Sequence, residues 1–141
     1  MSSWFGYALG AALLYGLHQI FTKLAAGKMG DGVGGFVVEA TAALTILGYL
    51  GALRLSGRWH QPVTREGLVW SAATGICVGA GTIAFFLLFQ KGGPLSAVPA
   101  ILAGGAALMA LTGVAVFKEP VSVQRLLGVV LAVMGLFFLR R

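Results

Sequence analysis

Four polar side chains recur at helical spacing inside the first apolar segment of the chain. They are Tyr15, His18, Gln19 and Thr22, within the sequence YGLHQIFT. The spacing i, i+3, i+4, i+7 puts them on one face of a helix. Hydrocarbon does not hydrate such a face, so it must turn toward protein or water. An aromatic ring beside an amide suits recognition of an organic solute, and hydrogen bonding between helices is the alternative. We predict that these residues bind a substrate.

Glu39 is a carboxylate inside the apolar run GGFVVEATAALTILGYL. A charge well inside a bilayer costs at least a few kcal/mol, so it usually has a partner or a function. Glu39 lies six residues into its segment, and His18 lies at a similar distance before the end of the previous one. An antiparallel hairpin would bring the two side chains to nearly one depth. Such a pair could exchange a proton as solute enters, or could fasten the hairpin. We add Glu39 to the predicted substrate-binding residues.

The composition indicates a membrane protein. Of 141 residues, 58% are apolar and only 10% are charged, with a mean hydropathy of +0.92, whereas soluble domains carry about 25% charged residues. The formal charge of +6 comes from scattered Lys and Arg, so no nucleic-acid surface is predicted. We expect these cations at the lipid interface. Met1–Ser3 hold no basic residue, so no cleaved signal peptide is expected.

The residues that common catalytic sites require are scarce. The only cysteine is Cys77, and the chain has two His and four acidic residues. No Gly-rich phosphate loop and no HExxH pair occur in the sequence. We therefore predict neither an enzyme nor a metal or cofactor site.

Five apolar stretches are long enough to cross a hydrocarbon core of about 30 Å, which needs roughly 20 helical residues. They are Trp4–Leu24, Val33–Leu53, Gly67–Phe89, Pro94–Phe117 and Val121–Leu139. The turn signals GDG, KGG and KEP and one longer polar loop separate them. The prediction is an all-α integral membrane protein in which residues 1–141 form one domain of five transmembrane helices.

The basic residues are divided evenly between the two sides that these five spans define. One side receives Arg54, Arg58, Arg65, Lys118 and Arg125, and the other receives Lys23, Lys28, Lys91, Arg140 and Arg141. Orientation normally follows an excess of Lys and Arg on the cytoplasmic side. A five-against-five count is either a chance tie or the mark of a chain that inserts in both orientations.

Small and kinking residues suggest close helix packing. Gly128 and Gly135 are seven residues apart, which is two helical turns, so they share a face that another backbone can approach. Glycine is also common in membrane helices generally. Pro99 is predicted to lie inside the fourth helix, where it would remove a backbone hydrogen bond and kink the helix. Such a kink would either flex during transport or serve static packing.

Two segments resemble a known family. YGLHQIFTKLAAG and the run KGGPLSAVPAILAGGAALMALTGVAVFKEPVSVQRLLGVVLAVMG are similar to EamA-type carriers of the drug/metabolite transporter superfamily. Members of that family hold two five-helix halves of opposite topology, and this chain resembles a single half. The smaller relatives, the small multidrug resistance proteins, work as antiparallel dimers. Their essential first-helix glutamate falls at Tyr15 here, so their ion exchange does not carry over. Their last-helix glycine pair matches Gly128 and Gly135, which implies a dimer interface there.

Together the residues and the resemblance favour a carrier that moves a small organic solute across a prokaryotic inner membrane by alternating access. The resemblance implies a homodimer, antiparallel if the charge count reflects dual topology, with the cavity between the two copies. Two alternatives stay open. One is a flippase for lipid-linked sugars, and the other is an accessory subunit that stabilises a larger membrane complex without transporting.

Overall fold

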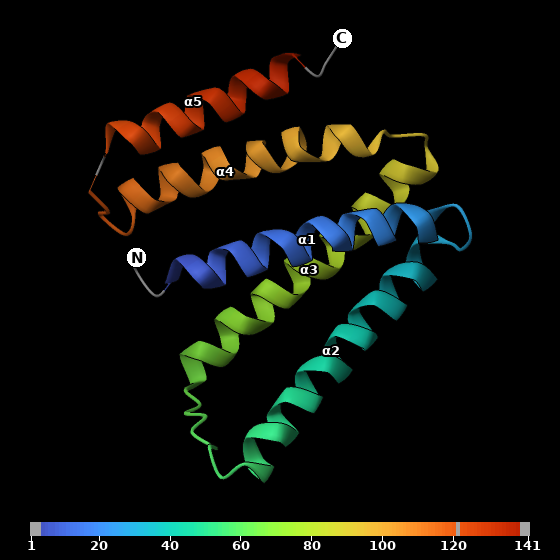
Figure 1. Cartoon of the computed structure of the whole chain (residues 1–141), viewed down its shortest axis with the longest axis vertical. Helices are drawn as coiled ribbons and strands as arrows, with labels where there is room; N and C mark the ends of the chain where they lie inside the picture. Colours follow the sequence, from blue (N-terminus) through green and yellow to red (C-terminus); the bar gives the residue numbers. More distant parts are fainter. Residues whose placement is uncertain (1–3, 121, 139–141) are drawn as a thin grey trace. The chain divides into compact units, whose positions relative to one another are not determined.

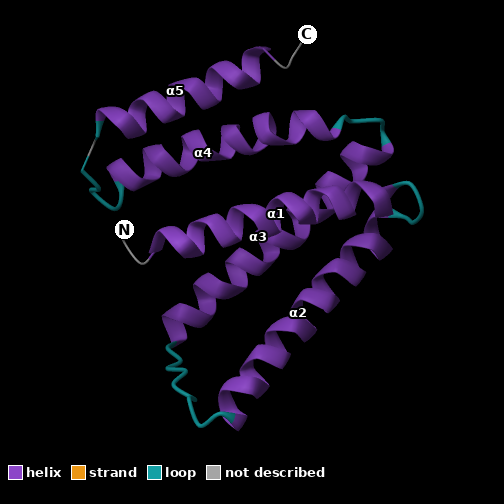
Figure 2. Cartoon of the chain, viewed as in Figure 1, coloured by secondary structure: helices purple, strands orange, loops and turns teal. Residues whose placement is uncertain are grey.

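The computed structural model describes residues 4–120 and 122–138. These residues form α1 (Trp4–Ala26), α2 (Asp31–Leu55), α3 (Arg65–Gln90), the short 3-10 turn η1 (Leu95–Ala97), α4 (Val98–Ala115) and α5 (Val123–Phe138) (Figures 1 and 2). No strand occurs within these two ranges. The prediction of an all-helical chain is confirmed. Val121 and Leu139, the predicted ends of the fifth span, lie outside the described residues, as do Arg140 and Arg141.

Three helical segments are long and apolar enough to cross a membrane. They are Asp31–Leu55, Arg65–Gln90 and the combined segment Leu95–Ala115. The chain therefore has the character of a multi-pass membrane protein. Within the described residues, α5 has 16 residues, fewer than the roughly 20 that a hydrocarbon core requires. α1 is long enough at 23 residues, but its polar stripe lowers its hydropathy.

Local signals explain where the helices begin and end. The Thr64 hydroxyl accepts a hydrogen bond from the Gly67 N–H at 3.0 Å and so caps the N-terminus of α3. At the other end of α3, Gly92 has a φ of +84° and donates its N–H to the Phe89 carbonyl at 3.1 Å. Glycine adopts this left-handed conformation without a Cβ clash, which terminates the helix.

Tertiary contacts divide the chain into two units, Met1–Gly92 with α1 to α3 and Gly93–Arg141 with α4 and α5. In the first unit α3 is the central element, because it packs against both α1 and α2, which contact each other much less. The buried residues of this unit gather at one end of its helices: Gln19, Thr22 and Ala26 of α1, Gly34 and Gly35 of α2, and Thr82, Phe86 and Phe89 of α3.

The turn between α1 and α2 marks this end. The Gln90 amide nitrogen donates to the Met29 carbonyl at 3.0 Å, which ties the last residue of α3 to that turn. The opposite halves of the three helices are mostly exposed, and loop 56–64 joins α2 to α3 there (Figure 2).

The second unit is a pair of neighbouring helices, α4 and α5 (Figure 1). The sequence predicts that Pro99 kinks the interior of the fourth helix, but the structure places Pro99 in the first turn of α4, directly after η1. First-turn N–H groups have no acceptor within the helix, so a proline here removes no intrahelical hydrogen bond. The predicted mid-helix break is thus replaced by a change from 3-10 to α-helix at Val98.

Candidate substrate-binding site

The structure buries only part of the polar stripe on α1. Gln19 is 7% exposed and Thr22 is 2% exposed, and His18 is half-buried. Tyr15 is 66% exposed, although its ring lies edge-on to the His18 ring at 6.4 Å between centroids. The stripe therefore turns inward over its last two turns, where α1 packs on α3, and faces outward at Tyr15.

The hydrogen bonds of the stripe are incomplete. The Thr22 hydroxyl donates to the His18 carbonyl of its own helix at 2.8 Å. The Nδ1 of His18 and the Oε1 of Gln19 are buried without a hydrogen-bond partner among the described residues. Most buried polar atoms in proteins are paired, so two unpaired atoms on adjacent residues are an unusual feature.

Glu39 finds its partner on α3. The Thr82 hydroxyl donates to the Glu39 Oε1 at 2.6 Å, and Thr82 is 4% exposed. In the described part of the chain, no ion pair joins Glu39 to His18. Equal depth in a hairpin does not by itself prove contact, and α3, rather than α1, provides the surface against which α2 packs.

From the sequence, Thr82 is only a weaker candidate, as are Ser71 and Thr74 of the same predicted span. A serine or threonine in a helix usually bonds its own backbone, and Thr74 does so by donating to the Trp70 carbonyl at 2.9 Å. Thr82 differs because it faces α2. Its spacing from Phe86 and Phe89, at i+4 and i+7, puts it on the buried face of α3.

Two glycines on α2 make this contact possible. A Cβ added to Gly34 would overlap the ring of Phe86, and one added to Gly35 would come within 3.3 Å of the Ile83 Cγ1. The missing side chains let α3 approach the α2 backbone closely, as small residues do in membrane helix pairs. This approach brings Thr82 within hydrogen-bonding distance of Glu39, one turn further along α2.

His18, Gln19, Thr22, Glu39 and Thr82 come from the three helices of the first unit and are together called the polar cluster below. A cation–aromatic contact joins α1 and α3 next to Thr22 in the sequence. The Lys23 Nζ lies 5.6 Å from the centroid of the Phe89 ring, within the range of a cation–π interaction. The polar cluster thus combines side-chain oxygen acceptors, those of Gln19 and Glu39, with the imidazole of His18.

The predicted dimer-interface glycines lie on α5, in the second unit. A Cβ added to Gly128 or Gly135 would meet nothing within 4 Å. No part of the described chain therefore occupies the space directly over these two positions. A partner helix there remains a prediction.

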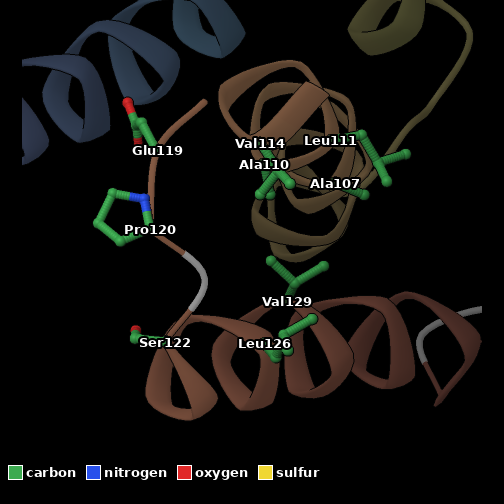
Figure 3. A pocket seen from close by; sticks show the side chains of 9 residues that line it. All are labelled: Ala107, Ala110, Leu111, Val114, Glu119, Pro120, Ser122, Leu126 and Val129. Carbon is green, nitrogen blue, oxygen red and sulfur yellow. The ribbon is translucent and has the colours of Figure 1, made fainter. Parts of the chain in front are cut away.

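The second unit also contains a cavity of about 340 Å³ between α4, α5 and the loop that joins them. Figure 3 shows Leu126 and Val129 of α5 facing α4, with Glu119 and Pro120 in the loop. Its lining is mainly apolar, with Glu119 and Ser122 as the polar exceptions. The backbone before Glu119 passes through Lys118, whose φ is +51°.

Comparison of the chain with protein-family models, with curated proteins and with solved structures found no match. The resemblance to EamA-type carriers therefore stays a prediction, based on the motifs in the sequence.

Proposed function

We propose that this protein is a membrane transporter for a small organic solute, and that the polar cluster lines the solute path. The observation that carries the proposal is the pair of buried, unpartnered atoms, His18 Nδ1 and Gln19 Oε1, in a chain of otherwise apolar helices. The members of the polar cluster come from all three helices of the first unit.

An unpaired buried polar atom costs about 1–3 kcal/mol. A helix contact that served packing alone would be more stable with apolar side chains at these positions. A solute that supplies the missing partner offsets the cost when it binds. The polar cluster is therefore better suited to bind a solute intermittently than to serve as a permanent contact between helices.

The hydrogen bonds already made indicate what the solute must bring. The two threonine hydroxyls donate their protons to the His18 carbonyl and to Glu39. The unpartnered Gln19 oxygen can only accept. A matching solute accordingly carries N–H or O–H donors, and Glu39 adds a carboxylate to the acceptors of the polar cluster.

We further propose that the working unit is a dimer and that the solute path opens alternately to the two sides of a prokaryotic inner membrane. The balanced Lys and Arg count in the loops and the uncovered glycine positions on α5 support an antiparallel homodimer. In such a dimer the second copy would supply the protein surface that the exposed apolar helices of one copy lack.

The test is a thermal-stability screen of the purified protein against a panel of metabolites, followed by uptake measurements in vesicles. A genuine substrate raises the melting temperature of the wild type and is taken up. Gln19→Leu should abolish both effects, because it removes the unpaired acceptor. Gln61→Leu is the control for the change from amide to alkyl, since Gln61 is exposed in the loop between α2 and α3. If solutes bind equally well to the Gln19 variant, the polar cluster is not the binding site.

A further inference from the structure

We infer that residues 54–66, at the end of α2 and the start of α3, form a binding surface for the phosphate headgroup of an anionic phospholipid. Three arginines mark this segment, here called the arginine loop. Arg54 lies in the last turn of α2, Arg58 in the connection and Arg65 at the first position of α3. Glu66 is the only acidic residue among them.

The arginines are available to an external acceptor. The Arg54 guanidinium carbon lies 5.9 Å from the centroid of the Trp59 ring. A cation–π contact uses no N–H donor, so the guanidinium N–H groups can still donate to another acceptor. None of the three guanidinium groups has a hydrogen-bond or ion-pair partner in the part of the chain that the structure describes, and every residue from 54 to 66 is exposed.

The arginine loop is placed at the level of lipid headgroups. It connects α2 and α3, two of the three helical segments that can cross a membrane, and tryptophan is enriched at that interface. Its flanking apolar side chains, Leu55 and Val63, are 92% and 71% exposed, so they can enter the acyl boundary beside it. A lipid phosphate, anchored in the same bilayer, meets these conditions better than a free ion.

The choice of cation also favours phosphate. The opposite end of the same unit carries lysines, Lys23, Lys28 and Lys91, whereas the arginine loop has arginine only. The guanidinium fork binds a phosphate through two parallel hydrogen bonds, which an ammonium does not.

The first test compares lipid binding by purified variants in detergent, with phosphatidylglycerol and phosphatidylcholine as probes and native mass spectrometry as the readout. One arginine near a membrane surface is worth about fivefold in affinity. Arg58→Gln/Arg65→Gln should therefore weaken phosphatidylglycerol binding about 25-fold and leave phosphatidylcholine unchanged. The Lys28→Gln/Lys91→Gln variant loses the same amount of charge at the other end of the first unit and should still bind phosphatidylglycerol as the wild type does.

A second measurement does not depend on charge-removing variants. A Trp4→Phe/Trp70→Phe protein keeps Trp59 as its only tryptophan. Its fluorescence should be quenched more strongly by brominated phosphatidylglycerol than by brominated phosphatidylcholine. Equal quenching by the two lipids, or equal loss of phosphatidylglycerol in the lysine variant, overturns the proposal. Displacement of the lipid by millimolar inorganic phosphate would show that a free anion is preferred, and would also overturn it.

Discussion

Replacing Gln19 by leucine should stabilise the empty protein, because the change removes an unsatisfied buried atom. The Gln19 side chain is 7% exposed and its Oε1 has no partner among the described residues. Relief of that desolvation is worth about 1–3 kcal/mol. Leucine is similar in length and in helix propensity, so packing and helix formation change little. We expect the free energy of unfolding to rise by about 1–2 kcal/mol.

The measurement is reversible unfolding of the purified protein by a denaturing detergent, followed by far-ultraviolet circular dichroism without solute. Gln61→Leu serves as control for the change from amide to alkyl, rather than Gln124, which shares a helix face with Gly128 and Gly135. Because Gln61 is exposed in the loop between α2 and α3, its replacement relieves no buried unsatisfied atom and should shift the free energy of unfolding by less than about 0.5 kcal/mol.

The stability result separates two explanations of the polar cluster. A gain in stability with loss of solute binding would mean that the amide is kept for function at a cost in stability. A fall in the free energy of unfolding of about 1 kcal/mol or more, beyond the change in the Gln61 control, would refute this explanation. The amide would then have a partner in the folded protein, and the cluster would be a packing feature.

Three further predictions concern packing and topology. Gly34→Ala should destabilise the first unit by about 1–3 kcal/mol through overlap with a buried phenylalanine ring, whereas Gly48→Ala, which meets nothing within 4 Å, should be neutral or stabilising in the same unfolding assay. Thr82→Val should lower stability by roughly 1–2 kcal/mol through loss of its bond to Glu39, and Thr74→Val, whose hydroxyl bonds its own helix, should have little effect. Reporters fused to the C-terminus should be active on both sides of the membrane in comparable amounts, and activity on one side alone contradicts the antiparallel dimer.

The helices themselves could be predicted from the sequence because long apolar runs between turn residues allow few alternatives. The predicted span Val33–Leu53 corresponds to α2 at Asp31–Leu55, and Gly67–Phe89 corresponds to α3 at Arg65–Gln90. The observed helices extend into the flanking polar residues because a capping residue such as Thr64, not the edge of the apolar run, sets the first turn.

The burial of individual site residues could not be predicted in the same way. Helical spacing shows that Tyr15 and Gln19 share a face, but not how far along that face a neighbour extends. α1 crosses α3 (Figure 1) and is buried only from Gln19 onward, so Tyr15 is left outside the contact. The crossing depends on contacts with α3, which is distant in sequence. Nothing in the sequence of the stripe itself indicates where those contacts begin.

The partner of Glu39 could not be predicted for a related reason. A hairpin predicts only how deep each residue lies along the helix axis. This depth correctly puts His18 and Glu39 toward the same end of the first unit. Which helix lies against α2 depends on Gly34, which admits Phe86, and on Gly35, which admits Ile83. In a chain with 22 glycines, the sequence gives no reason to select this pair. The sequence contains the carboxylate and the threonine, but their contact is a property of packing.

The concentration of buried residues at one end of the first unit has a mechanical consequence. The Gln90–Met29 hydrogen bond and the Gly34–Phe86 contact hold the helices together at this end, here called the clamp. Beyond the clamp the helices are mostly exposed, so each can rotate about it as a rigid rod. From Ala40 to its end at Leu55, α2 extends about 24 Å. A rotation of about 10° at the clamp would therefore move its far end by about 4 Å, while the clamped end would hardly move. With this geometry, a change of one hydrogen bond beside the clamp would be amplified into a large displacement of the far helix ends, on one side of the bilayer only.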